Sequence, residues 1–260
     1  MGISEISKVT EYSDINEVLY SLAQGVVKIF DKNLVGLYLS GSLSYGDFEL
    51  ERSDIDLLTI LNKPASQEQI ELLKKMHLQV EKNNPKWAKR IECSYIPIDM
   101  LQNTLPPQSP RPYVGEGIFY PKALYGNEWL INKYLLYKHG VTLIGPDFKK
   151  LVKHLDIKDV KEACVRDLFK EWQPKITHPT YLKNSHYQSY VILNLCRILY
   201  TMKCNDAASK SVSASWVKKE YGSRWKRLIE KAENWKYGTE MNSLDETKEF
   251  IKFVISEVKR

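Results

Sequence analysis

The stretch LSGSLSYGDFELERSDIDL, residues 39–57, decides the fold class of this chain. It starts at the end of a short apolar run at 35–39, passes through the turn-forming residues Ser40-Gly41-Ser42, and ends in a second apolar run at 55–60. Apolar runs of about four to eight residues that are bounded by turn residues are typical of buried strands. The stretch therefore predicts two strands of a buried sheet, joined by a polar loop.

Two carboxylates open the second of these strands. Asp54 and Asp56 are two residues apart, so an extended backbone directs both side chains to one face. Carboxylates this close repel each other unless a cation lies between them, and hard oxygen ligands suit Mg²⁺, which also binds substrate phosphates. Gly41 lets the backbone approach a phosphate closely, and Ser42 can donate both its N–H and its hydroxyl. An isolated Asp-x-Asp is often a solvated turn, but this combination favours a magnesium and phosphate site.

A third carboxylate, Glu92, interrupts an otherwise apolar run at 91–98. Strict alternation places it on one strand face together with Ser94 and Ile96. Glu92 is either a charge on an edge strand that points to solvent or a functional group that faces the aspartate pair. In the second interpretation, which we favour, it helps to hold metal and removes the proton of an acceptor hydroxyl.

The periodicity along the chain predicts an α/β domain over 1–155 and an all-α helical bundle over 156–260. Apolar residues recur at helical spacing in 14–30, 64–82, 128–139, 182–203, around 225–235, and in 244–258. The stretch 105–121 contains five prolines and two glycines, so we expect a long loop there.

Composition and charge narrow the function classes. Residues 1–155 contain 18 Lys/Arg and 18 Asp/Glu, whereas residues 156–260 contain 20 and 14. A basic C-terminal half suits an anionic ligand such as a nucleoside triphosphate or nucleic acid, or it is a solvated, lysine-rich helical surface. No signal-peptide-like run opens the chain, and no apolar run reaches the roughly eighteen residues of a membrane span. We therefore expect a cytoplasmic protein without a membrane or nucleic-acid partner.

The motif Gly41-Ser42 followed by Asp54-Ile55-Asp56 and a later strand carboxylate resembles the polymerase-beta-type nucleotidyltransferase superfamily. Within it, the chain resembles the aminoglycoside adenylyltransferases that modify streptomycin and spectinomycin. The similarity extends to LIGP at 143–146 and to 190–216, with RILY at 197–200 and Ser209-Lys210. The resemblance implies a nucleotidyltransferase domain of mixed sheet and helices, a C-terminal helical bundle, and magnesium-dependent transfer of AMP from ATP to a hydroxyl.

The resemblance also assigns roles to nine residues. They are Asp54, Asp56 and Glu92 for metal binding and catalysis, Gly41, Ser42, Ser53 and Lys210 for the nucleotide, and Trp172 and Tyr187 for the acceptor. Without the resemblance, Lys210 can also be interpreted as a surface lysine, and Trp172 as a core or interdomain residue. We expect two magnesium ions, ATP as co-substrate, a small hydroxylated acceptor, and a monomer.

Two departures from the family pattern concern the acceptor. Residues 173–189 contain no Asp or Glu, and Tyr187 stands where the family has a carboxylate that grips a cationic drug. Gly117 follows Gly115-Glu116 where the family has an aromatic residue. A guanidinium-bearing drug such as streptomycin needs carboxylates, because an unpaired buried charge is costly. We therefore expect a less charged acceptor such as spectinomycin, unless Glu116, Glu128, Asp167 or Glu171 supplies the charge.

Two alternatives remain open. The acceptor is instead a lincosamide, an RNA end or a protein hydroxyl, or the chain is a non-catalytic, nucleotide-binding regulatory relative. Such relatives commonly lose a carboxylate of the triad, whereas this chain contains all three.

Overall fold

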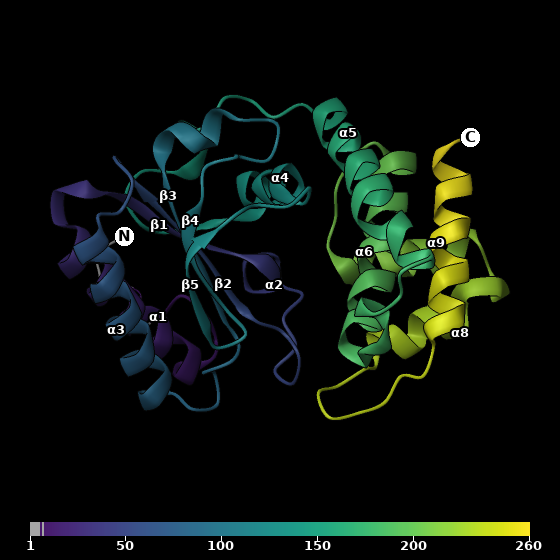
Figure 1. The fold of residues 1–260 in the computed structure, drawn as a ribbon, viewed down its shortest axis with the longest axis horizontal. Coiled ribbons are helices and arrows are strands. Elements are labelled where there is room, and N and C mark those ends of the chain that lie inside the picture. The colour runs from purple at the N-terminus through teal and green to yellow at the C-terminus, as the bar shows by residue number, and fades with distance from the viewer. Residues whose placement is uncertain (1–5, 7) are drawn as a thin grey trace. The chain divides into compact units, whose positions relative to one another are not determined.

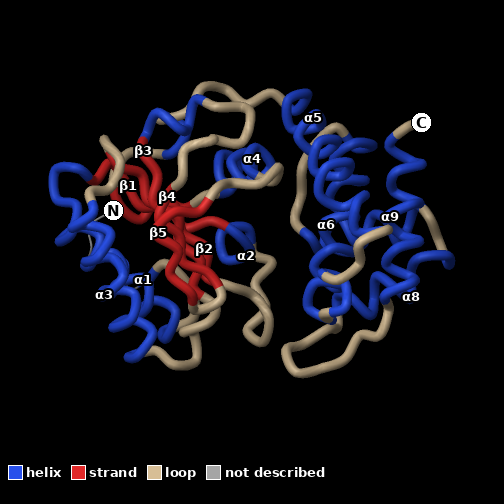
Figure 2. Tube along the Cα trace, viewed as in Figure 1, coloured by secondary structure: helices blue, strands red, loops and turns tan. Residues whose placement is uncertain are grey.

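The computed structural model describes residue 6 and residues 8–260, which form two compact units (Figures 1 and 2). The first unit contains the residues up to Phe48, Ser53–Tyr125 and Leu135–His154, and the second contains Glu49–Arg52, Gly126–Tyr134 and Leu155–Arg260. Two short segments from the first 155 residues thus belong to the helical unit. The chain is an α/β part followed by helices, as the sequence predicts.

A mixed sheet forms the centre of the first unit. Among the described residues it has six strands in the order β5-β4-β3-β2-β1-β6. They are β1 (Leu34–Ser40), β2 (Ile55–Leu61), β3 (Ile91–Pro97), β4 (Arg111–Gly115), β5 (Ile118–Ala123) and β6 (Val141–Ile144). β2 and β3 run parallel, and the other neighbours run antiparallel. The first three strands lie within one residue of their predicted positions.

Two long helices, α1 (Ser13–Phe30) and α3 (Gln67–Asn83), lie against each other beside the sheet (Figure 1). The apolar positions of α1 at helical spacing, Ile15, Val18, Leu19, Leu22 and Val26, are all 0% exposed. They share one core with Leu37, Leu39 and Ile55 of the strands. The spacing that predicts α1 is therefore the spacing with which it buries its inner face.

The prediction of a loop at 105–121 is wrong for the second half of this stretch, because β4 and the start of β5 form a hairpin there. The turn residues Glu116 and Gly117 have φ of +54° and +74°, which is the backbone that a tight two-residue hairpin turn requires. This turn is therefore a structural reason for a glycine at position 117. Pro112 lies at the register shift between Arg111 and Tyr113, where a missing N–H is tolerated.

The second unit is a bundle around α6 (Ser185–Cys204). This helix contacts α5 (Ile157–Asp167), α7 (Lys210–Glu220), α8 (Ser223–Glu233) and α9 (Leu244–Val258). Its residues Val191, Leu195 and Ile198 are at most 2% exposed. Two further helices, α2 (Gly41–Tyr45) and α4 (Trp129–His139), occur earlier in the chain. In the part of the chain that the structure describes, no helix combines the length and apolarity needed to cross a bilayer.

Candidate active site

The junction between β1 and α2 lies directly against Asp56. Gly41, the first residue of α2, has φ +63°, a conformation that favours glycine. A Cβ at this position would lie 1.8 Å from Oδ2 of Asp56. The adjacent Ser40 is paired with Asp56 across the antiparallel strands, and its hydroxyl donates to the Asp56 carbonyl oxygen at 3.3 Å. The absence of a side chain at Gly41 therefore leaves room for the carboxylate.

Asp56 and Glu92 are direct neighbours on parallel strands. Asp56 of β2 is in register with Glu92 of β3, and both residues are partly exposed. The residues that flank Asp56, Ile55 and Leu57, are at most 4% exposed and belong to the apolar core. Since β3 lies between β2 and β4, Glu92 is not on an edge strand. The interpretation of Glu92 as an edge-strand charge is therefore wrong.

Sequence reasoning missed two residues of the hairpin, Tyr113 and Arg111. The Tyr113 hydroxyl donates a hydrogen bond to Glu92, and burial, together with the charges of Glu92 and Asp56, raises the pKa of Tyr113. Arg111 is 6% exposed and donates from Nε to Oγ of Ser94 at 3.1 Å. The alternation within 111–115 is the signal that could have placed both residues beside Glu92.

The remaining predicted residues of the first unit surround the same strand ends. Asp54 directly precedes β2, and the Ser53 carbonyl accepts a hydrogen bond from Arg90. In α2, the Ser42 carbonyl accepts the Asp47 N–H at 3.0 Å. Ser42 and Ser53 are therefore on the two segments that lead into and out of the polar loop.

The carboxylate oxygens of this site are the ligands that Mg²⁺ prefers, and the space kept free by Gly41 adjoins one of them. The donor chemistry therefore fits magnesium. Within residue 6 and residues 8–260, no three His, Cys, Asp or Glu side chains are gathered closely enough to hold a metal ion. The backbone brings Asp56 to Glu92, whereas the assignment of Asp54 as the third ligand stays a prediction.

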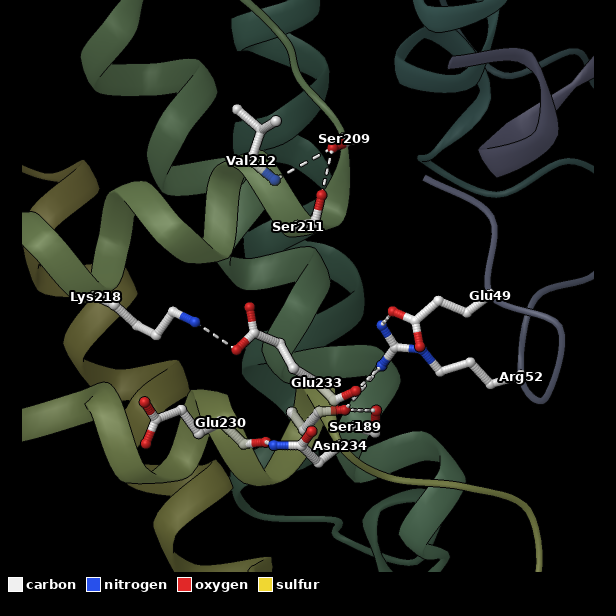
Figure 3. A network of polar contacts seen from close by, with 11 residues as sticks. Glu49, Arg52, Ser189, Ser209, Ser211, Val212, Lys218, Glu230, Glu233 and Asn234 are labelled. Atoms are coloured by element: carbon white, nitrogen blue, oxygen red, sulfur yellow. Dashed lines mark hydrogen bonds and ion pairs between the residues drawn. The ribbon is translucent and has the colours of Figure 1, made fainter. Parts of the chain in front are cut away.

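Arg52, in the loop before Asp54, contacts the C-terminal end of α8 (Figure 3). The Arg52 guanidinium donates to the carbonyl oxygens of Ala232 and Glu233 and forms an ion pair with Glu49. A cation at the C-terminal carbonyls of a helix is favourable, because those carbonyls have no partner within the helix and carry partial negative charge. These contacts explain why Glu49–Arg52 belongs to the second unit.

A cavity of about 190 Å³ lies within the second unit and is lined in part by Glu128, Asp167, Glu171, Trp172, Tyr190 and Arg197. Trp172 ends a π-helical turn, Leu168–Trp172, that follows α5, and the residue is 5% exposed. Its indole N–H donates to Oδ2 of Asp167 at 2.7 Å. Trp172 thus forms a wall of a cavity as well as part of the core.

The other two predicted residues of this unit lie around the same aromatic group. The Tyr187 ring stacks on that of Tyr181, which lines the cavity, with centroids 3.9 Å apart. Lys210 begins α7, whose N-terminus is capped by Ser209 through the Val212 N–H at 3.2 Å (Figure 3). The Lys210 ammonium lies 4.8 Å from the ring centroid of Tyr190. Lys210 is therefore next to a cavity residue and is not an isolated surface lysine.

Comparisons with known proteins agree with this arrangement. Residues 21–105 match the family described as a nucleotidyltransferase domain, and residues 150–260 match the aminoglycoside adenylyltransferase C-terminal domain. Spectinomycin 9-adenylyltransferase of Campylobacter jejuni is 24% identical over 213 residues, which cover 78% of this chain and 76% of that protein.

One solved structure shows the same fold. It is spectinomycin adenyltransferase AAD(9) from Enterococcus faecialis with ATP and spectinomycin, at a TM-score of 0.72 and 19% identity. The match covers 94% of this chain and 99% of that one, which confirms the predicted fold class. On the two family matches, the chain is a nucleotidyltransferase that combines a nucleotidyltransferase domain with an aminoglycoside adenylyltransferase C-terminal domain.

Proposed function

We propose that this enzyme transfers AMP from ATP to a hydroxyl of a small aminocyclitol acceptor, with spectinomycin favoured over streptomycin. The observation that carries the proposal is the register of Asp56 and Glu92 on parallel strands, beside the glycine turn at Gly41. Two relatives that share the fold or the sequence carry spectinomycin in their names. They support the choice of acceptor.

The residues have separate roles in an in-line displacement at the α-phosphorus. Asp54, Asp56 and Glu92 would hold Mg²⁺, as two ions, which when bound neutralises charge on the triphosphate. Gly41, Ser42 and Ser53 bind the triphosphate through backbone and hydroxyl groups, and Lys210 adds a positive charge. Glu92 accepts the proton of the acceptor hydroxyl, whose oxygen attacks the phosphorus, and pyrophosphate leaves with the electrons of the broken bond. Tyr113 orients the Glu92 carboxylate through its hydrogen bond.

The charges of the cavity support an acceptor with little positive charge. Glu171 is already paired with Lys175 at 2.5 Å, and Arg197 lines the same cavity. Burial raises the pKa of Asp167 to about 7, so this carboxyl is only partly ionised near neutral pH. Glu128 accepts the N–H of Gly126 at 3.0 Å. Few carboxylates of the cavity are thus left to replace the water that the guanidinium groups of streptomycin would lose on binding.

A panel experiment tests the proposal. The wild-type protein is incubated with ATP, Mg²⁺ and, in separate reactions, spectinomycin, streptomycin and a lincosamide, and each product is examined by mass spectrometry. We expect an AMP adduct of spectinomycin with pyrophosphate release, and little or none of streptomycin. The Glu92→Gln variant is the matched control for enzyme-dependent transfer.

The same panel separates the alternatives. An adduct on the lincosamide alone would move the enzyme to another acceptor class. No adduct on any small molecule, with ATP still bound, would favour the non-catalytic alternative. Strong streptomycin resistance in a susceptible host, lost on neutralising Glu128 or Asp167, would contradict the proposed acceptor.

A further inference from the structure

The Asp167–Trp172 hydrogen bond depends on an irregular turn of helix. Asp167 is the last residue of α5, and the chain then continues as the π-helical turn Leu168–Trp172. π-helical turns are rare in proteins, and those that occur often lie at functional sites. The wider turn brings the indole N–H of Trp172, five residues later, to 2.7 Å from Oδ2 of Asp167.

The Trp172 ring is contacted on several sides. The rings of Tyr181 and Tyr190 lie 6.3 and 6.1 Å away between centroids, and the Lys175 ammonium lies 5.2 Å from the ring centroid. Both tyrosines line the cavity with Trp172 and Asp167. The hydrogen bond adds a directional contact at the N–H edge of the indole to these tilted and edge-on ring contacts.

Asp167 is a costly residue for a purely structural role. It is 5% exposed, and burial raises the pKa of its carboxyl, as do the charges of Glu128 and Glu171, whereas the Trp172 hydrogen bond and Arg197 lower it. An apolar side chain would avoid this cost, at the expense of a buried indole N–H without a partner.

Another buried tryptophan of the same unit provides a comparison for the Trp172 indole. Trp225 is 6% exposed, and its indole N–H has no hydrogen-bond partner in the described part of the chain. A buried, unpaired indole N–H is thus tolerated in α8, far from the cavity lining in sequence. The hydrogen bond from Trp172 to Asp167 is thus a feature that the buried Trp225 lacks.

We propose that Asp167 is a positioning residue for acceptor recognition, which holds the Trp172 indole in the orientation that shapes the wall of the cavity. This inference rests on the proposed function, because it takes the cavity as the place where the acceptor's ring binds. Asp167 acts through a hydrogen bond and not through its charge. Its loss weakens acceptor binding and leaves ATP use and the chemical step nearly unchanged.

Kinetic constants of four variants and one control variant test this role. Asp167→Leu and Trp172→Phe each remove one partner of the bond, and we expect each to raise the KM for spectinomycin roughly tenfold, with kcat and the KM for ATP nearly unchanged. Asp167→Asn retains an oxygen that can accept the bond, so its KM stays close to the wild-type value. The Asp167→Leu/Trp172→Phe double variant is expected to be no worse than the worse single variant. Trp225→Phe, which removes an N–H without a partner, is the matched control.

A spectroscopic readout tests the bond without turnover. In ¹⁵N–¹H spectra, the Trp172 indole signal is identified by its loss in Trp172→Phe. We expect slow hydrogen exchange of this signal in the wild type and in Asp167→Asn, and fast exchange in Asp167→Leu. If the wild type modified no acceptor, the proposed function would fail, while this signal would still report whether Asp167 holds the ring.

Two results would overturn the inference. One is a KM for spectinomycin in Trp172→Phe that equals the wild-type value. This variant leaves Asp167 unchanged, so the result remains informative if Asp167→Leu does not fold. The other is an Asp167→Asn variant with slow indole exchange and an acceptor KM as high as that of Asp167→Leu, which would assign the effect to charge.

Discussion

Gly41 and Asp56 lie so close together that a single added carbon would not fit between them: a Cβ at position 41 would be 1.8 Å from Oδ2 of Asp56. The backbone of Gly41, at φ +63°, adds conformational strain for any other residue. We expect Gly41→Ala to displace the Asp56 carboxylate and to lower kcat/KM by roughly 10²-fold, the loss that a misplacement of about 1 Å can cause. Steady-state kinetics of AMP transfer measure the effect.

Gly46 provides the matched control, because it has a similar φ of +75° but nothing within 4 Å of an added Cβ. Gly46→Ala should cost about 1 kcal/mol of stability and leave kcat/KM nearly unchanged. Equal losses of activity in the two variants would show that backbone strain, and not the contact with Asp56, is responsible.

The aspartate pair should be dispensable for folding and essential for transfer. We expect Asp54→Asn and Asp56→Asn each to abolish AMP transfer while Tm changes by no more than a few degrees, because removing one of two repelling carboxylates does not destabilise the metal-free protein. Removal of Mg²⁺ with a chelator should have the same effect on the wild type. Asp99→Asn, at an exposed position after β3, is the control. Near-normal turnover of either active-site variant with Mg²⁺ would refute the metal assignment.

Glu92 and Tyr113 should affect the chemical step to different extents. Glu92→Gln removes the base, so we expect kcat to fall by roughly 10²–10⁴-fold, with a smaller change in the KM for ATP. Tyr113→Phe removes only the hydrogen bond to Glu92, and we expect a fall of roughly tenfold in kcat. A wild-type kcat for Glu92→Gln would return this residue to a structural role.

The strands that carry the carboxylates could be predicted because local and tertiary preferences agree there. Each is a short apolar run with turn residues beside it, and alternation alone places Glu92 on one face of β3. The pairing of Asp56 with Glu92 additionally requires that β2 and β3 be parallel neighbours, which the helical pattern between them, now α3, favours.

The hairpin was missed, because its prolines weaken the strand signal that the alternation within 111–115 carries. Pro112 lies where the ladder is irregular and Pro121 lies on the edge strand β5, so neither interrupts a regular central ladder. Tyr113 was missed together with the hairpin. The docking of Arg52 on the carbonyls of Ala232 and Glu233 joins residues about 180 positions apart, and no local pattern encodes such a contact.

Asp167 should make the stability of the protein fall as pH rises toward neutrality. Its pKa is about 7 in the folded chain against a usual value of 3.8, because burial penalises the ionised form. Between these values the folded state binds more protons than the unfolded state, so the free energy of unfolding decreases with increasing pH, by at most about 1.4 kcal/mol per pH unit from this group. The neighbouring groups Glu128, Glu171, Arg197 and Cys164 modify the slope.

Asp167→Asn removes this titration. Urea unfolding at about pH 5 and about pH 8 measures the free energy of unfolding of the variant and of the wild type. The variant should gain stability relative to the wild type as pH increases, since the amide carries no buried charge at either pH. Asp99→Asn, which changes a carboxylate at an exposed position, is the control. Parallel stability profiles for the wild type and Asp167→Asn would mean that Asp167 is ionised in the folded protein throughout this range. The cavity would then hold a permanent negative charge, and a more cationic acceptor would become the better substrate.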